Sequence, residues 1–375
     1  MAWGWDGGYR SPQPSPHMKL FFKPLHEQTI VITGASSGIG LATARAAAAQ
    51  GANVVLASRN ASALEAITSE INTSRSGSAV YVVGDVARRD DLQRVADTAI
   101  SRFGGFDTWV NNAGVTIYGR LEEVSDADFE RLFQTNFWGV VRGSLIAVKH
   151  LKKRGGALIN IGSVLSDSSI ALQGMYSASK HAVKGFTNAL RMELEAESAP
   201  VSVTLIKPGA IDTPYTRHAK NYMREEPKHV PPVYAPEEVS RAILYAATHA
   251  KRDIYVGSSA KAMSVINRFA PRVMDRIGGS PMIKQQKREE PARNPEGSLY
   301  QAGFGGEERG DQPGHVMERS FYTRSSLHPL LTGAVLATAG VAAGVVIQAK
   351  RRRHESTDGE RAPNQPRSRQ LTGVE

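Results

Sequence analysis

The stretch Thr33-Gly34-Ala35-Ser36-Ser37-Gly38-Ile39-Gly40 joins an apolar run at residues 29–33 to a helical pattern at residues 39–50. Glycine lets the backbone approach a phosphate closely or adopt a positive φ. A strand that enters a helix through such a turn points backbone N–H groups and the positive helix end at a pyrophosphate. The turn is therefore predicted to bind a nucleotide, and a purely structural glycine turn is the alternative.

Short β-branched runs alternate with longer helical patterns around this turn. Strands are expected at residues 29–33, 53–57, 79–83, 108–110, 157–161, 201–206 and 253–256. Helices are expected at residues 39–50, 61–72, 90–102, 126–153, 175–197 and 236–249. Crossover connections between such strands give a parallel sheet that helices cover on both faces. The sequence predicts a doubly wound α/β domain over residues 27–257.

Composition excludes several other classes of protein. The 375 residues include no cysteine, which excludes disulfides, thiolate metal sites and a cysteine nucleophile, and we expect no metal site. The net charge of +10 could indicate a nucleic-acid partner, but residues 27–257 contain 25 basic and 23 acidic residues. A domain so close to neutrality lacks the basic surface that nucleic-acid binding requires. The excess basic charge belongs to the flanking segments.

The flanking segments are expected to be organised apart from the α/β domain. We expect a flexible segment at 1–26, a helical extension at 258–290, a Gly/Pro-rich linker at 291–328, a transmembrane or membrane-associated helix at 329–349 and a disordered basic tail at 350–375. As a helix, the uncharged residues 330–347 would be about 27 Å long, enough to cross a bilayer. A helix packed on a protein surface is the alternative. Residues 1–26 lack the apolar core of a secretion signal, so the catalytic domain is expected in the cytoplasm, anchored through residues 330–347.

The residues after the second and third strands bear on cofactor choice. The second strand ends in Ala57-Ser58-Arg59, at the place where an acidic residue would bind the ribose hydroxyl of NAD and an arginine the 2′-phosphate of NADP. Arg59 therefore favours NADP(H), and NAD(H) is the alternative if Arg59 only stabilises a loop. Asp85 and Val86, after the third strand, are placed to meet the adenine.

Four later polar residues form a candidate catalytic group. Asn136 stands within a predicted helix, where asparagine is a poor helix former. Ser163 follows the strand at 157–161, and Tyr176 precedes Lys180 by four residues, so these two share a helix face. A nearby cation stabilises phenolate and lowers the pKa of a tyrosine, which would make Tyr176 able to transfer a proton. The Ser163 hydroxyl is placed to hydrogen-bond the substrate oxygen.

Together these motifs resemble the single-domain branch of the short-chain dehydrogenase/reductase family, and in particular uncharacterised bacterial reductases with an extended C-terminus. The resemblance covers residues 27–257 of 375. It rests on residues 33–40, Asn111-Asn112-Ala113-Gly114, the four polar residues above, and Pro208-Gly209 followed by Ile211-Asp212-Thr213. It implies a Rossmann-like sheet of seven parallel strands with NAD(P) lying over the carboxyl ends of the strands.

The resemblance also implies a role for each residue. Tyr176 would be the general acid in reduction and the general base in oxidation, and Lys180 would bind the nicotinamide ribose. Ser163 would orient the carbonyl, and Asn136 would hold a water of the proton relay. The implied cofactor contacts are Gly34, Ser36, Ser37, Gly38, Ile39, Gly40, Arg59, Asp85, Val86, Asn112, Ala113, Gly114, Tyr176, Lys180, Pro208, Gly209, Ile211 and Thr213.

The leading hypothesis is an NADP(H)-dependent oxidoreductase for a small lipophilic carbonyl or alcohol. The apolar residues 230–234, expected to cover the substrate, and the candidate membrane helix support the lipophilic part. One alternative is a reductase of 3-oxoacyl chains on an acidic carrier protein, for which Arg217, Lys220, Arg224 and Lys228 could form a basic patch or only a solvated surface. Another is an NADP(H)-binding membrane scaffold without turnover. The resemblance also implies a homo-oligomer formed through the helices that carry Asn136 and Tyr176.

Overall fold

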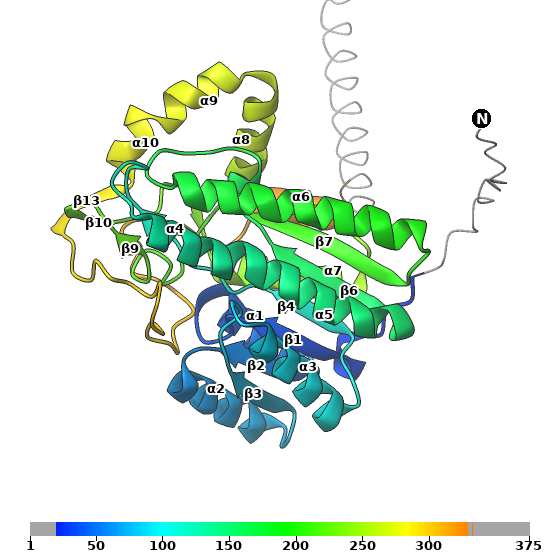
Figure 1. Cartoon of the computed structure of the whole chain (residues 1–375). Helices are drawn as coiled ribbons and strands as arrows, with labels where there is room; N and C mark the ends of the chain where they lie inside the picture. The colour runs from blue at the N-terminus through cyan, green and yellow to red at the C-terminus, as the bar shows by residue number, and fades with distance from the viewer. Residues whose placement is uncertain (1–19, 329–331, 333–375) are drawn as a thin grey trace, which may run out of the picture. The chain divides into compact units, whose positions relative to one another are not determined.

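The computed structural model describes residues 20–328 and residue 332. Seven parallel strands form the central sheet in the order β12-β7-β6-β4-β1-β2-β3 (Figure 1). Their bounds are β1 Thr29–Thr33, β2 Asn53–Ser58, β3 Ala79–Val83, β4 Thr108–Asn111, β6 Gly156–Ile161, β7 Val201–Pro208 and β12 Asp253–Val256. The predicted seven-stranded, doubly wound sheet is confirmed. The direction of winding reverses between β1 and β4, which is where such sheets bind ligands.

Helices cover both faces of this sheet. Their bounds are α1 Gly38–Ala49, α2 Ala61–Ser74, α3 Arg89–Phe103, α4 Asp126–Phe133, α5 Gly139–Arg154, α6 Gly174–Ala196 and α7 Pro236–Thr248. Side chains of α1, α2 and α7 share an apolar cluster with Ile30 and Ile32 of β1, whereas those of α3, α5 and α6 share one with Val31. Successive side chains of a strand point to opposite faces, so the fully buried β1 needs an uncharged, mostly apolar run throughout.

Shorter elements connect these strands and helices. They are η1 Leu25–Glu27, β5 Ile117–Tyr118, η2 Gln134–Trp138, η3 Val164–Ser166, β8 Ala210–Ile211, β9 Lys220–Asn221, β10 Glu225–Pro227 and β11 Val233–Tyr234. The continuous helix expected over residues 126–153 is not continuous, because the π-helical turn η2 separates α4 from α5. Such turns commonly mark functional positions in a helix, and this one contains Asn136.

The chain beyond β12 begins with a helical extension. Within residues 258–290 the structure has α8 Ser258–Phe269, α9 Pro271–Gly278 and α10 Ser280–Gln285. The strand β13 Lys287–Pro291 follows and pairs antiparallel with β10. The three helices lie together beyond the end of the sheet (Figure 1).

Residues 291–327 lie against the α/β domain instead of forming the linker that their composition predicts. The strand β14 Val316–Met317 pairs with β11, and the helix α11 Phe321–Leu327 contacts β12 and α7. Leu299 and Thr323 are fully buried. A segment with few apolar side chains is predicted to be a linker, because it has little to bury. Here a few single side chains are buried against the surface of residues 27–257, and these contacts hold the segment in place. One compact unit therefore continues to Leu327.

Three of the expected flanking segments fall largely outside the described residues. These are residues 1–19 of the N-terminal segment, the candidate membrane helix apart from Thr332, and the basic tail. Among residues 20–328, no helix is both long and apolar enough to cross a bilayer.

The contacts of α11 predict how far the folded unit can be shortened. The Glu238 carboxylate is 1% exposed, and it accepts hydrogen bonds from Ser320 N at 2.9 Å and from Arg324 Nη2 at 2.7 Å. A chain that ends at Gly310 loses both donors, although Arg241 Nε stays 3.6 Å from the carboxylate. A hydrogen bond to a charged group contributes about 1.5–3 kcal/mol. We expect its melting temperature to fall by several degrees, whereas a chain that ends at Leu327 should melt like the full chain. Equal melting temperatures for the two shortened chains in calorimetry would contradict this account of α11.

Candidate active site

The glycine turn between β1 and α1 lies at the carboxyl edge of the sheet. Gly34 and Gly38 have positive φ of 67° and 53°. A Cβ on Gly40 would lie 2.1 Å from the Gly34 carbonyl oxygen, so only glycine fits there. The Asn112 amide donates to the Thr33 and Gly34 carbonyls at 3.0 and 3.2 Å and ties the turn to the end of β4. This packing holds the N-terminus of α1 in place beside the strand ends, where its backbone N–H groups can meet an anion.

A cleft of about 180 Å³, here called the glycine cleft, opens beside this turn. The predicted cofactor contacts that line it are Gly34, Ser36, Ser37, Gly38, Ile39, Arg59, Asp85, Val86, Asn112, Ala113, Gly114 and Thr213. Pro208, Gly209 and Ile211 line an adjoining cavity, and Gly40 is buried behind the turn. Ile39, Asn112, Gly114 and Thr213 line both spaces. The structure thus gathers the predicted residues around two adjoining spaces.

Residues 296–310, here called the strap, cross the glycine cleft, which nothing in the local sequence pattern indicated. The Arg59 guanidinium donates to the backbone carbonyls of Ser298, Leu299 and Tyr300 at 2.5, 3.2 and 3.1 Å. Burial lowers the pKa of Arg59, but its guanidinium remains a cation in any protein. The sequence therefore predicted correctly that Arg59 lies in the cleft, but it did not predict that the guanidinium binds backbone carbonyls of the strap.

Further contacts of the strap reach the glycine turn itself. Gly306 N donates to Ser36 O, and Gly38 N donates to Glu307 O, both at 2.9 Å. The Asn60 amide donates to Gly303 O at 2.8 Å. An oxygen atom therefore accepts a hydrogen bond from the start of α1, which is the place where a phosphate oxygen was expected.

Asp85, expected to meet adenine, is paired with an arginine. Its Oδ2 lies 2.5 Å from Arg131 Nη2, and Arg131 Nε donates to Leu299 O at 3.1 Å. The other carboxylate oxygen accepts from Ala87 N at 2.9 Å. Asp85 therefore holds both the β3–α3 loop and, through Arg131, the strap. Any contact with an adenine amine would be shared with Arg131.

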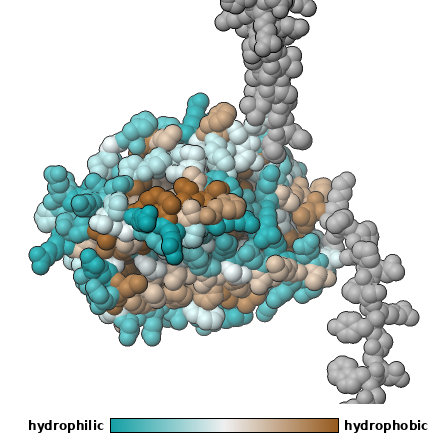
Figure 2. All heavy atoms as spheres, turned by 90° about the horizontal axis from the view of Figure 1, so that it is seen from above, coloured by the Kyte–Doolittle hydropathy of each residue, from teal (hydrophilic) through white to brown (hydrophobic). Residues whose placement is uncertain are grey.

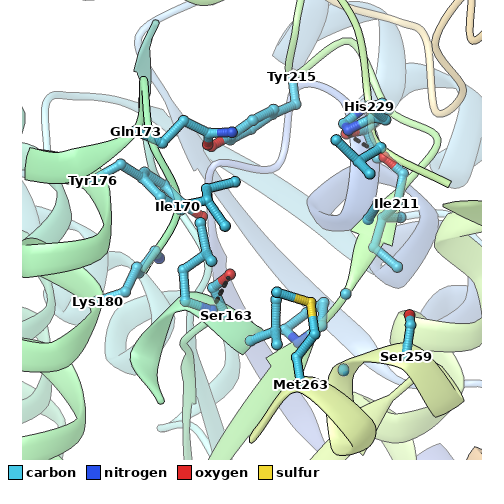
Figure 3. A pocket seen from close by; sticks show the side chains of 18 of the residues that line it. Ser163, Ile170, Gln173, Tyr176, Lys180, Ile211, Tyr215, His229, Ser259 and Met263 are labelled. Carbon is cyan, nitrogen blue, oxygen red and sulfur yellow. Dashed lines mark hydrogen bonds between the residues drawn. The ribbon is translucent and has the colours of Figure 1, made fainter. Parts of the chain in front are cut away.

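The adjoining space, here called the tyrosine cavity, measures about 360 Å³ (Figure 3). It brings together three of the four predicted catalytic side chains, Ser163, Tyr176 and Lys180. Most of its wall is apolar, and the extension adds Met263 of α8 and Met282 of α10. A cavity of this size that is largely apolar, with a few converging polar groups, is typical of a small-molecule site.

Tyr176 and Lys180 lie on the first turns of α6, and their electrostatics differ from the expectation. Lys180 Nζ donates to Ile161 O at 2.9 Å and stands 5.6 Å from the centre of the Tyr176 ring. Burial lowers the pKa of Lys180 to about 8. Burial also raises the pKa of Tyr176, and hydrogen bonds from Tyr215 and Ser163 lower it without cancelling the rise. The predicted lowering by Lys180 is not seen, because its ammonium faces a backbone carbonyl.

Asn136 lies outside both spaces and is fully buried. Its Oδ1 accepts from Val115 N at 2.8 Å, and its Nδ2 donates to Val115 O at 2.9 Å and to Ser179 Oγ at 3.2 Å. The side chain therefore connects the segment after β4 to α6. Both of its N–H donors are used in this connection, which limits what the side chain could offer a relay water.

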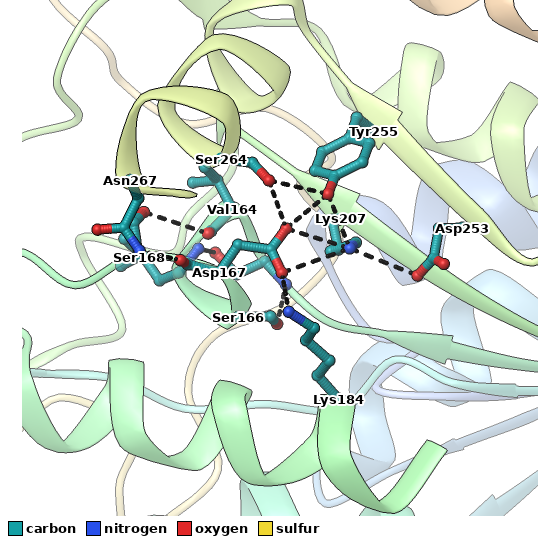
Figure 4. A network of polar contacts seen from close by, with 12 residues as sticks. Val164, Ser166, Asp167, Ser168, Lys184, Lys207, Asp253, Tyr255, Ser264 and Asn267 are labelled. Carbon is teal, nitrogen blue, oxygen red and sulfur yellow. Dashed lines mark hydrogen bonds and ion pairs between the residues drawn. The ribbon is translucent and has the colours of Figure 1, made fainter. Parts of the chain in front are cut away.

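A buried ionic network holds the loop that carries Ser163 (Figure 4). The Asp167 carboxylate contacts Lys184 of α6 at 2.5 Å, Lys207 of β7 at 3.1 Å and Tyr255 Oη of β12 at 2.6 Å. Burial alone would raise the pKa of Asp167, but the hydrogen bonds from Lys184 and Tyr255 and the charge of Lys207 hold it well below its usual range. Ser264 of α8 donates to the same carboxylate at 3.0 Å. The network therefore fixes the Ser163 loop to the sheet and to the extension together.

Sequence reasoning missed Tyr215 and Gln173, which form one wall of the tyrosine cavity (Figure 3). The Tyr215 ring lies 5.6 Å from the Tyr176 ring, and its hydroxyl donates to Gln173 Oε1 at 3.0 Å. Gln173 precedes the predicted Tyr176 by three residues, and Tyr215 follows the predicted Thr213 by two. Their nearness in sequence to predicted site residues was the signal that could have identified them.

Residues 28–223 match the sequence model of a family described as short chain dehydrogenase. The chain is 49% identical over 329 residues to an uncharacterised oxidoreductase, YxnA, of Bacillus subtilis, which covers 86% of this chain and 92% of that protein. It is 31% identical over 267 residues to 11-beta-hydroxysteroid dehydrogenase A of Sesamum indicum, covering 68% of this chain and 76% of that one. An alcohol dehydrogenase from the archaeon Thermococcus sibiricus, solved with 5-hydroxy-NADP, superposes with a TM-score of 0.54 at 28% identity, covering 61% of this chain and 95% of that one.

Proposed function

The chain belongs to the short-chain dehydrogenase family, and from that premise we propose that it transfers hydride between NADP(H) and a lipophilic secondary alcohol or ketone. The observation that carries the proposal is the junction of the two spaces. The glycine cleft, which lies beside the N-terminus of α1, adjoins the cavity that contains Ser163, Tyr176 and Lys180. A cofactor in the cleft would reach a substrate held against those three side chains.

The residues of the cavity can move the proton that hydride transfer requires. When bound, the nicotinamide cofactor supplies or removes the hydride at the substrate carbon. Tyr176 donates its phenolic proton to the carbonyl oxygen in reduction and takes it back in oxidation. Ser163 Oγ accepts from Leu165 N at 3.1 Å, and its own proton can go either to the Tyr176 hydroxyl or to the substrate oxygen. Lys180, whose Nζ stands 5.6 Å from the centre of the Tyr176 ring, would hold the nicotinamide ribose.

Support for NADP(H) over NAD(H) comes from the charge at the end of β2. Ser58 and Arg59 line the glycine cleft there, and neither offers a carboxylate to a ribose hydroxyl. A guanidinium pairs well with a phosphate. The 2′-phosphate would share Arg59 with the strap carbonyls that the guanidinium already contacts.

The apolar wall of the tyrosine cavity supports a lipophilic substrate. Ile170, Ile211, Val230 and Met263 face the space where the substrate would lie, and a relative is named as a hydroxysteroid dehydrogenase. The 3-oxoacyl carrier alternative draws less support from its basic patch. Arg217 pairs with Glu307 at 2.7 Å and Lys220 with Glu296 at 2.8 Å, so two of the four charges are already neutralised by the strap. The scaffold alternative is disfavoured because Ser163, Tyr176 and Lys180 are all in place.

The substitution Tyr176→Phe tests the proposed reaction. It removes the hydroxyl that transfers the proton, so we expect turnover of ketones with NADPH to fall by about 100 to 10,000-fold. NADPH affinity, measured by fluorescence titration, should stay nearly unchanged. Tyr222→Phe is the matched control, because the Tyr222 hydroxyl bonds Asp128 at 2.8 Å and does not line the cavity. A Tyr176→Phe enzyme that keeps more than about a tenth of its activity would refute the mechanism.

The substitution Arg59→Ala tests the cofactor preference. Losing a charge-assisted hydrogen bond should weaken NADPH binding by about 10 to 150-fold, with little change for NADH. Arg45→Ala is the control for strap anchoring, since Arg45 bonds Glu308 of the strap at 2.7 Å without lining the cleft. That variant should change both cofactor affinities alike. An equal loss of NADPH and NADH affinity in Arg59→Ala would make Arg59 an anchor of the strap only.

We further propose that this cytoplasmic enzyme is attached to a membrane through residues 330–347. Support comes from the uncharged character of that segment and from Lys350-Arg351-Arg352-Arg353 directly after it, which favours anionic headgroups. Apolar side chains also gather on the face of the domain in Figure 2. The exposed apolar residues of α8 and α9 are Val265, Phe269, Val273 and Ile277.

Fractionation of two chains tests this attachment. The full chain should sediment with membranes and be released by detergent, whereas a chain that ends at Leu327 should stay in the supernatant. The compact unit ends at that residue, so the shorter chain keeps its fold. If both chains remain in the supernatant without detergent, residues 330–347 are not a membrane anchor.

A further inference from the structure

Tyr215 stands in the tyrosine cavity at the centre of a chain of aromatic and polar contacts. Its ring lies 5.6 Å from Tyr176, 5.8 Å from His229 and 6.5 Å from Tyr118. Figure 3 shows Tyr215 beside Gln173 and across from the Tyr176 side chain. It belongs to the loop after β8, not to the helix that carries Tyr176 and Lys180. The fold therefore brings a second tyrosine hydroxyl to the proposed proton donor from an independent element.

The hydroxyl of Tyr215 has two acceptors within reach and one proton to give. It donates to Gln173 Oε1 at 3.0 Å, and the hydroxyl of Tyr176, whose ring centre lies 5.6 Å from that of Tyr215, is the second acceptor. A hydrogen bond from Tyr215 lowers the pKa of Tyr176. Burial, followed by the neighbouring tyrosines, raises the pKa of Tyr215 well above its usual value, so it stays a donor when Tyr176 ionises.

We propose that Tyr215 is a positioning residue for Tyr176, whose phenolate it stabilises by turning its hydroxyl proton from Gln173 to the Tyr176 oxygen. No covalent bond to Tyr215 forms or breaks in this step. Tyr176 gives its proton to the substrate oxygen as hydride reaches the carbon, and the Tyr215 proton is only reoriented. A hydrogen bond to an ionised acceptor is about twice as strong as one to a neutral acceptor. The reorientation therefore favours the state in which the proton has been transferred.

The C-terminal extension holds Gln173, the side chain that accepts the Tyr215 proton while Tyr176 is neutral. Gln173 Nε2 donates to Gln286 Oε1 at 2.8 Å, and Gln286, which is fully buried, donates to Ala171 O at 3.0 Å. Gln286 directly follows α10 and caps its C-terminal end. A relay of hydrogen bonds thus runs from the extension to Tyr215 and Tyr176. Gln286 lies outside residues 28–223, which the family model matches, and still contributes to the proposed chemistry.

Few ionisable groups other than the two tyrosines face this site. Lys180 approaches from α6, Tyr118 from β5 and Lys228 from the loop before β11. Burial lowers the pKa of His229, which stacks on Tyr215, to about 4, so it is neutral at physiological pH. No aspartate or glutamate is among the described residues that line the cavity. The ionisation of Tyr176 is therefore set mainly by its burial and by its hydrogen-bond donors.

The substitution Tyr215→Phe tests the inference, which rests on the proposed function, through the pH dependence of alcohol oxidation. We would measure kcat/KM with NADP⁺ for 2-octanol, cyclohexanol and a hydroxysteroid. Oxidation needs ionised Tyr176, so the rate rises with pH through the pKa of that residue. Removing a donor that stabilises phenolate should move the midpoint upward by about one to two pH units. At neutral pH, kcat/KM should fall by about 10 to 100-fold.

Two further variants separate positioning from packing. Tyr118→Phe removes the same atom from the neighbouring ring and should leave the midpoint unchanged, although it lines the same cavity. Gln173→Met removes the competing acceptor, so its midpoint should be no higher than that of the wild type, even if Tyr215→Phe fails to fold. If the wild-type enzyme oxidises the alcohols and the Tyr215→Phe enzyme has the same midpoint in its pH profile, Tyr215 has no positioning role. If the wild type binds NADPH but oxidises none of the alcohols, the proposed function and this inference both fail.

Discussion

The contact between Gly40 and the carbonyl of Gly34 is the constraint on which the site depends. With a hydrogen in place of a side chain, α1 can begin directly above the end of β1, because a Cβ would come within 2.1 Å of that oxygen. This close approach sets the distance between the N-terminus of α1 and the end of β4, where Asn112 closes the turn. The glycine cleft and the tyrosine cavity both open from this corner. Wider spacing there would separate the cofactor from the residues that handle the proton.

The sheet and the residues at its edge could be predicted because short stretches of sequence are enough to identify each strand and the residues that follow it. Each strand is a short apolar run, and parallel strands place their carboxyl ends together, so Ser163 and Asn112 had to meet. The strap could not be predicted in this way. Its hydrogen bonds to Arg59 use backbone carbonyls, which every residue carries, and its sequence reads as a linker. Tyr215 was missed for a related reason, since the irregular loop that carries it has no periodicity to reveal which way the side chain points.

The boundary expected at residue 257 does not separate the site from the extension. Asp167 joins the Ser163 loop to α8 through Ser264, and Gln286 at the end of α10 supports Gln173. The strap closes the cleft from the other side. Buried polar networks of this kind are costly to leave half satisfied, because each unpaired member keeps its desolvation penalty. The extension therefore belongs to the same structural unit as the residues of the proposed site.

The strap has a kinetic consequence for the cofactor. Its bonds from Arg59, Asn60 and the glycine turn would have to open before a dinucleotide could pass. An opening step of this kind slows both arrival and departure, so the bound lifetime grows. Displacing the strap from Gly38 N also lowers the affinity for the cofactor. A long-lived cofactor can be reduced by one alcohol and reoxidised by another ketone without leaving the protein. In that regime the enzyme equilibrates two substrates with each other, and the free cofactor pool in the cell matters little to its rate.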